Sequence, residues 1–297
     1  MPGKAVPRDV VFMWENSAQH KARLAEDPAF LAEHMRQGAV SGDVEAQLGW
    51  AHMLLEGHGT APDPVAAFRW FQLAARSRST EAINMLGRCH ELGWGTARNT
   101  RVAAQCYRVA GEAGHAWANF NLAMLMLARD GAEGEKRDIL SLLVRSARRG
   151  NAKAMNAIGE ACEEGWRGAA KIVPARRWYV RAARRGCFRG AFNTARHLMG
   201  DGDVDGAVCW LRQSITRAPG AFCVELASHL ADHPDSRLRE VAALALERAR
   251  SAPERAKASI PGIETKIAPD TQPTPRRRRS AGRVWRALTR AKRSRPV

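Results

Sequence analysis

Few residues in this 297-residue chain have the type and spacing that catalysis needs. Glu160, Glu163 and Glu164 form a local carboxylate cluster that could in principle act in acid–base chemistry. Such a run on one helix face is more typical of a solvated surface. Phosphate-binding, dinucleotide-binding, zinc-protease and nucleophile-elbow motifs are all missing from the sequence. The sequence therefore predicts no enzyme, no cofactor and no small-molecule substrate.

Metal ligands are also sparse. His229 and His233 stand four residues apart and could lie on one helical face, as two ligands of a metal site would. The alternative is that His233, just before Pro234, ends a helix and interacts with its dipole. The six cysteines form no CxxC pair and are predicted to be free, buried thiols: Cys89, Cys106, Cys162, Cys187, Cys209 and Cys223. We therefore predict no metal site.

The positive charge is concentrated at the C-terminal end of the sequence. The formal net charge is +17, and residues 251–297 hold thirteen Lys and Arg against three acids. Six prolines in this segment indicate a disordered linker. It ends in a polyanion-binding candidate made of Arg276, Arg277, Arg278, Arg279, Arg283, Trp285, Arg286 and Arg290. Nucleic acid, an anionic lipid surface or an acidic protein could bind there, and a purely solubilising tail stays open.

Composition bounds the class of protein. The apolar fraction of 45% and the charged fraction of 26% are those of a globular chain. No stretch is long and apolar enough to span a membrane, and no secretory signal is recognisable at the start. We expect a cytoplasmic protein, with peripheral association with the membrane or the nucleoid left open.

Residue types recur at intervals of 36. One small position reads Ala46, Ala82, Ala118 and Ala154, and a second reads Ala51, Gly87, Ala123 and Gly159. A bulky position reads Phe71, Tyr107, Leu143 and Tyr179. Four copies without an insertion indicate a repeat protein. Each unit reads as two amphipathic helices, with a Gly-rich turn after the first and Asp63-Pro64 or a similar start before the second.

These residues resemble the Sel-one-like repeat, a relative of the tetratricopeptide repeat. The segments that carry the resemblance are 67–75, 81–96 and 175–186. It implies an all-α, right-handed α/α solenoid of about five to six helix-pair repeats, common in bacterial regulatory, envelope or stress pathways. We predict an N-terminal helical cap over 1–41, the repeats over 42–250 and the basic tail over 251–297. The units are placed near 42–79, 80–115, 116–151, 152–187, 188–220 and 221–250, the fifth about four residues short in its loop.

The resemblance further implies that the first helices line a concave groove for a protein or peptide. The predicted groove residues are Arg88, Glu91, Trp117, Phe120, Met124, Leu127, Asn156 and Glu160. The central four are apolar and the flanks are polar, as in a protein-binding site. The alternative is that Trp117, Phe120 and Met124 pack against neighbouring helices.

Two loop tryptophans, Trp94 and Trp166, lie two repeats apart at the same position. They could anchor a partner along one edge, or pack over the glycine turn of their own unit. Together these features predict a non-catalytic adaptor that binds a protein partner, with the tail as a second anchor. The alternative is a protein associated with nucleic acid or an anionic membrane mainly through its tail.

Overall fold

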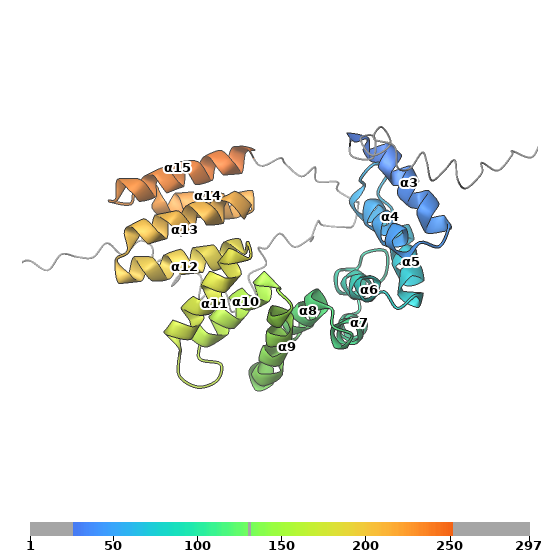
Figure 1. The fold of residues 1–297 in the computed structure, drawn as a ribbon, viewed down its shortest axis with the longest axis horizontal. Helices are drawn as coiled ribbons and strands as arrows, with labels where there is room; N and C mark the ends of the chain where they lie inside the picture. The colour runs from blue at the N-terminus through green and yellow to red at the C-terminus, as the bar shows by residue number, and fades with distance from the viewer. Residues whose placement is uncertain (1–25, 130–131, 252–297) are drawn as a thin grey trace, which may run out of the picture. The chain divides into compact units, whose positions relative to one another are not determined.

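The computed structural model describes residues 26–129 and 132–251 (Figure 1). Within these ranges all regular structure is helical, with one 3-10 turn at Ala132–Glu135 and no strand. The all-α solenoid class predicted from the repeat is confirmed. The chain divides into two compact units, whose described parts are residues 26–114 and residues 115–251.

A single helix and two helix pairs make up the first unit. They are α3 (Pro28–Val40), then α4 (Val44–Glu56) with α5 (Pro64–Arg76), then α6 (Thr80–Leu92) with α7 (Thr100–Glu112). Four pairs make up the second unit: α8 (Ala116–Leu127) with α9 (Lys136–Arg148), α10 (Ala152–Glu163) with α11 (Ile172–Arg184), α12 (Phe188–Asp201) with α13 (Val204–Arg217), and α14 (Gly220–Leu230) with α15 (Ser236–Ser251).

Short polar residues start most of these helices, as the sequence predicts for the Asp63-Pro64 pair. The Asp63 carboxylate accepts a hydrogen bond of 2.9 Å from the Ala66 N–H, and Pro64 occupies the first helical position of α5. The carboxylate satisfies an amide that no carbonyl of the helix can reach. The preceding helix, α4, ends at Gly57, whose φ of 71° is left-handed.

Replacing Asp63 with Ala is expected to lower the free energy of unfolding by about 1 kcal/mol, because the first turn of α5 loses its cap. Urea unfolding of the full chain, followed by circular dichroism, measures the change. Asp63→Asn is the control, since an amide oxygen still accepts the bond from Ala66. An equal loss in both variants would show that the carboxylate acts through its charge instead.

In the first unit, the second glycine of each GxG turn packs closely against the start of an earlier helix. A Cβ on Gly95 would overlap the carbonyl oxygen of Pro64, where α5 begins. A Cβ on Gly59 would likewise overlap the carbonyl oxygen of Pro28, where α3 begins. Each turn thus packs backbone to backbone against the start of an earlier helix, which only glycine permits.

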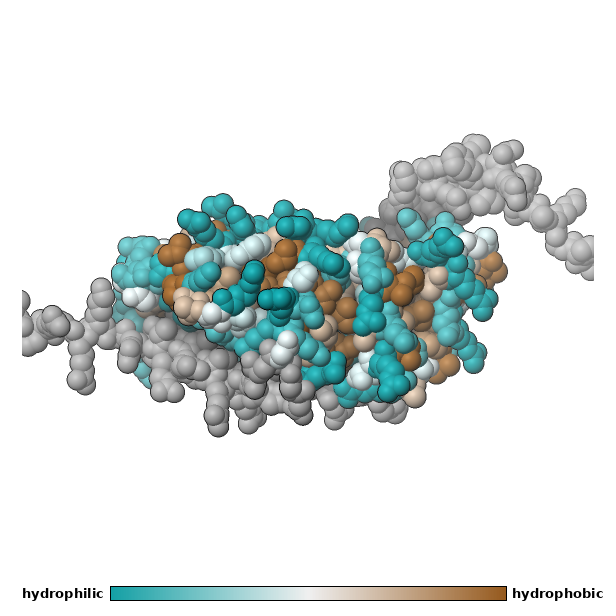
Figure 2. Space-filling model, turned by 90° about the horizontal axis from the view of Figure 1, so that it is seen from below, coloured by the Kyte–Doolittle hydropathy of each residue, from teal (hydrophilic) through white to brown (hydrophobic). Residues whose placement is uncertain are grey.

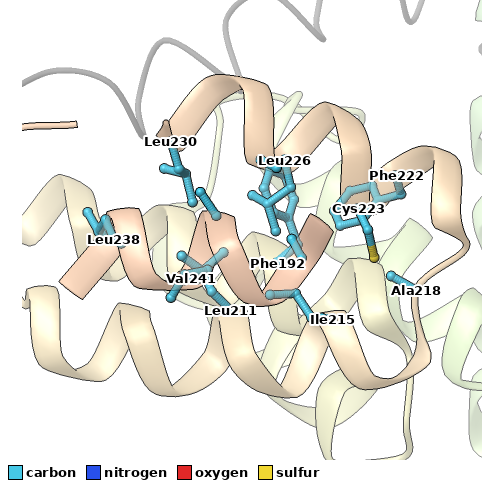
Figure 3. Close-up of a cluster of buried hydrophobic side chains, with 14 of the residues drawn as sticks. Phe192, Leu211, Ile215, Ala218, Phe222, Cys223, Leu226, Leu230, Leu238 and Val241 are labelled. Carbon is cyan, nitrogen blue, oxygen red and sulfur yellow. The ribbon is translucent and has the colours of Figure 1, made fainter. Parts of the chain in front are cut away.

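Each unit has its own hydrophobic interior. In the first unit Phe71 and Trp94 are buried together with Ala and Met side chains of α4 and α6. In the second unit one cluster gathers around Leu143 on α9 and Ile158 on α10. Another lies among α12, α13, α14 and α15, the four helices at the orange end of the ribbon in Figure 1. Figure 3 shows Leu211, Leu226, Leu230, Leu238 and Val241 pointing toward one another there, all fully buried.

The later helix pairs differ from one another in the length of their internal loops. Two residues, 202 and 203, join α12 to α13, whereas residues 164–171 join α10 to α11, so the fifth loop is short as expected. The predicted sixth pair, 222–231 and 238–250, corresponds to α14 and α15. At the N-terminus the predicted helix over 28–38 is α3, and the one over 9–25 lies outside the described residues.

Candidate functional site

An apolar stripe runs along α8 and is formed by Trp117, Phe120, Met124 and Leu127. Trp117 is 46% exposed, and its ring meets that of Phe120 edge to face at a centroid distance of 6.0 Å. Phe120, Met124 and Leu127 are half-buried because their inner sides pack on the cluster around α9 and α10. These four residues, which the sequence predicts as the apolar part of the groove, therefore lie on one face of α8, and each keeps part of its surface exposed.

Lys153, in the first turn of α10, borders this stripe. Its Nζ lies 5.5 Å from the centroid of the Trp117 ring, within the range of a cation–π contact. Figure 2 shows apolar residues in brown lying among polar ones on one face of the molecule. Exposed apolar side chains are not confined to α8, because Val65 on α5 and Val109 on α7 are also exposed. The α8 stripe is distinguished by an exposed tryptophan.

Asn156 is not available to a partner, and its prediction as a groove residue needs correction. It is only 3% exposed, because α12 packs beside α10 and covers it. Its Oδ1 accepts a hydrogen bond of 3.0 Å from Nδ2 of Asn193, and its Nδ2 donates to Glu160 at 3.1 Å. Glu160, also in the predicted groove, is half-buried at the end of this amide chain.

Glu163 anchors a second polar network between the same helices. It accepts two hydrogen bonds from the Arg196 guanidinium, at 2.8 and 2.6 Å, and one of 2.8 Å from the Tyr179 hydroxyl. Nε2 of His197 lies 3.6 Å away. Burial raises the pKa of Glu163, but the hydrogen bonds from His197 and Arg196 outweigh it and hold the pKa far below the usual value. A general base needs a pKa near neutrality, so this carboxylate has a structural role.

The expectation that Glu160, Glu163 and Glu164 form one solvated face is thus wrong for Glu163. Only Glu164 of the three is fully exposed. A signal for the network was present in the sequence at twice the repeat length. The pair of Glu163 and Tyr179 recurs 72 residues earlier as Glu91 and Tyr107, whose hydroxyl donates to Glu91 at 2.5 Å.

The first unit uses its two predicted groove residues for internal contacts. Glu91 accepts the bond from Tyr107, and burial together with this carboxylate raises the pKa of the tyrosine well above its usual range. The Arg88 guanidinium lies 4.7 Å from the centroid of the Trp94 ring. Both side chains therefore hold α6 to its surroundings and are not free groove positions.

The two loop tryptophans differ in exposure. Trp94 is 3% exposed and belongs to the hydrophobic interior of the first unit, so its prediction as an anchor for a partner is corrected. Trp166 is half-buried, donates a hydrogen bond of 2.9 Å from Nε1 to Glu164, and has Lys136 at 5.7 Å from its ring. Packing within the unit explains Trp94, while Trp166 keeps an exposed edge.

The cysteines are free thiols, but not all are buried as predicted. Cys89, Cys187 and Cys223 are buried, Cys106 and Cys162 are intermediate, and Cys209 is exposed. Burial raises the pKa of the Cys89 thiol to about 12, which leaves it unreactive near neutral pH.

Three further sequence hypotheses concern metal binding, membrane spanning and polyanion binding. His229 and His233 do not form a cluster with a third metal ligand in the described ranges. No helix in those ranges is long and apolar enough to cross a membrane. The polyanion-binding candidates between 276 and 290 lie outside the described residues.

Comparison with known proteins identifies the repeat. The family model for the Sel1 repeat matches residues 44–79, 80–115 and 152–187. No curated protein matches the chain. Sel1 repeat folds are in general scaffolds for protein–protein interaction.

Solved structures share this fold at low sequence identity. A Sel1 repeat protein from Oxalobacter formigenes is 21% identical with a TM-score of 0.65, over 79% of this chain and 98% of that one. A protective antigen of uropathogenic Escherichia coli is 23% identical with a TM-score of 0.55, over 78% of this chain and 52% of that one. An immunity protein from Pseudomonas aeruginosa is 15% identical with a TM-score of 0.53, over 72% and 84%. The chain thus contains three Sel1 repeats, and its helix pairs share the fold of these solved structures.

Proposed function

We propose that this protein is a non-catalytic adaptor that binds a protein segment along the apolar stripe of α8. The observation that carries the proposal is the exposure of Trp117, at 46%, on a helix face that continues through Phe120, Met124 and Leu127. Tryptophan is enriched among the residues that dominate binding energy at protein interfaces. Half-buried neighbours around it can exclude water once a partner covers them.

The polar side chains of the second unit support an adaptor over an enzyme. The buried amides and Glu163 are satisfied by one another across α10 and α12, which favours a rigid scaffold. Among the described carboxylates, Glu163 is the one held most deeply in a network, and its lowered pKa does not suit acid–base chemistry. A rigid face with a partly exposed apolar stripe suits binding without chemistry.

The test is capture of partner proteins by the full chain from its native host, quantified by mass spectrometry. Trp117→Asp is expected to reduce capture of a specific partner about tenfold or more, because it removes a central aromatic and adds a charge that must be desolvated. Val109→Asp is the matched control, since Val109 is 53% exposed on α7 of the first unit.

Equal capture by wild type and both variants would overturn the proposal for α8. A loss in both variants would place the binding determinant elsewhere or show a general effect of surface charge. Circular dichroism of each variant checks that the helices remain, which is expected because both side chains are largely at the surface.

A further inference from the structure

Cationic side chains gather at one edge of the second unit, where each second helix of a pair turns into the first helix of the next. We name as the basic edge the residues Arg149, Arg185 and Arg217. Arg149 and Arg185 directly follow the last residues of α9 and α11, Arg217 is the last residue of α13, and all three side chains are exposed.

Contacts between consecutive turns place these residues in a row. A Cβ on Gly150 would lie 2.6 Å from Nη1 of Arg185, so this guanidinium rests on the turn that follows Arg149. In the same way the Arg217 guanidinium rests on Gly186, next to Arg185. Three arginines from successive repeats therefore follow one another along the edge.

The charge on this edge is one-sided. Residues 139–159, 172–200 and 206–224, which contain these turns and the adjoining helix segments, hold no Asp or Glu. The acids of the same helices lie toward their other ends, as Asp138, Glu163 and Asp201 do. The sequence around this row of arginines therefore carries a positive net charge.

Helix stability does not account for the pattern. Cations near the C-terminal ends of α9, α11 and α13 interact favourably with the helix dipole, which could explain Arg149, Arg185 and Arg217. The dipole alone does not require a cation, however, because α7 ends at Glu112, is capped by Ala113 and has no basic residue in its last turn.

The first unit provides an internal comparison at equivalent positions. The second residue of α4 is Glu45 and that of α6 is Glu81, as the dipole favours. The positions 36 and 72 residues before Arg149 hold Ala113 and Ser77. The cation at the position of Arg149 is thus missing from the two equivalent positions of the first unit.

We propose that the basic edge binds the phosphate backbone of a nucleic acid without reading its bases. A row of guanidiniums fits a linear polyanion, and Arg forms paired hydrogen bonds with phosphate oxygens. A protein partner would require apolar anchors, and none of the described large exposed apolar side chains lies within 145–153, 181–189 or 213–219. The proposal is independent of partner binding at α8, because none of its residues is on that helix.

The test measures binding of the full chain to a fluorescein-labelled DNA duplex of about 20 base pairs by anisotropy, a length that offers more phosphates than the row can contact. All variants carry Ser at positions 276–279, so that the tail contributes equally and weakly. The edge variant combines Arg149→Gln, Arg185→Gln and Arg217→Gln. The matched control combines Arg98→Gln, Arg101→Gln and Arg108→Gln, three exposed arginines of the first unit.

The edge variant is expected to bind about tenfold more weakly at 0.1 M salt, and the slope of log K against log salt is expected to fall by about 3, because three phosphate contacts are lost. The control variant should bind within about twofold of the parent, and a triple Arg→Lys edge variant, which keeps the charge but loses the paired hydrogen bonds, should bind more tightly than the Gln edge variant. Equal losses in the edge and control variants would overturn the proposal. So would equal competition by polyglutamate, or binding only to phosphatidylserine vesicles, which would assign the edge to an acidic protein or a membrane. Thermal unfolding of each variant confirms that the fold is retained.

Discussion

Replacing Glu163 with Gln is expected to lower the free energy of unfolding by about 3 kcal/mol, because removing one partner of a buried ion pair leaves the other uncompensated. The side chain of Arg196 is only 11% exposed, and its two bonds to Glu163 join α12 to α10. The same carboxylate accepts the Tyr179 hydroxyl from α11. One substitution therefore weakens the contact of three helices.

The neighbouring glutamate supplies the control. Glu164 is exposed and accepts a hydrogen bond from the Trp166 indole, so Glu164→Gln should change the free energy by no more than about 0.5 kcal/mol. Urea unfolding of the full chain, followed by circular dichroism, compares the two variants. A similar small effect for both would show that Arg196 is satisfied by water when Glu163 is lost.

The stabilisation by Glu163 also depends on pH with a defined sign. The pKa of this carboxyl in the folded chain lies below its ordinary value of 4.5. A lowered pKa contributes stability at pH values above 4.5, and this contribution is lost as the pH falls below that value. The difference in stability between wild type and Glu163→Gln should therefore shrink steadily below about pH 5. A difference that stayed constant down to about pH 3 would contradict the charge-based explanation.

Replacing Gly87 with Ala is expected to destabilise the first unit by about 1–3 kcal/mol through overpacking. A Cβ at this position would lie 2.6 Å from Cε1 of Tyr107, which is fully buried and has no room to move away. Gly159 and Tyr179 repeat the same contact, at 2.5 Å, in the second unit. The midpoint of thermal unfolding measures the loss.

The chain itself indicates how the loss can be relieved. The small position holds Ala in two repeats, where the residue at the bulky position is Phe71 for Ala51 and Leu143 for Ala123 and is never Tyr. Tyr107→Leu combined with Gly87→Ala should therefore cost less than the sum of the two single changes. Strict additivity of the two changes would show that the side chains do not contact each other in solution.

Gly200→Ala is the control for the intrinsic effect of adding a methyl group to a helix. Gly200 lies inside α12, and a Cβ there would have no atom within 4 Å. Because Ala favours the helix over Gly, this variant is expected to gain up to about 1 kcal/mol. The opposite signs of the two Gly→Ala changes separate packing from propensity.

The coupling of a small residue to a bulky one explains why the fold could be predicted from the sequence. The ring of Tyr107 can pack on the backbone at Gly87 only if the spacing between the two residues is kept. Gly159 and Tyr179 make the same contact at the same spacing, so the contact preserves the sequence pattern of the repeat. Helix starts such as Asp63-Pro64 and the double glycines are local signals of the same kind. These signals predict helix pairs, which the structure contains.

The candidate site was harder to predict because burial depends on the neighbouring repeat. Asn156 occupies a position that analogy leaves exposed, yet α12 covers it and Asn193 bonds to it. The burial of Trp94 also depends on packing between helices, because its turn folds back onto the hydrophobic interior of the first unit. The missed signal was the doubled period of 72 residues, which the pairs Glu91–Tyr107 and Glu163–Tyr179 share.

The central claim is that a protein partner binds along α8, and hydrogen–deuterium exchange tests it most directly. The full chain is compared with and without the partner that wild type captures and Trp117→Asp does not. The account predicts added protection over Ala116–Leu127, the span of α8, with little change in α4 and α5 of the first unit. Protection confined to other helices, with α8 exchanging as in the free chain, would contradict the account.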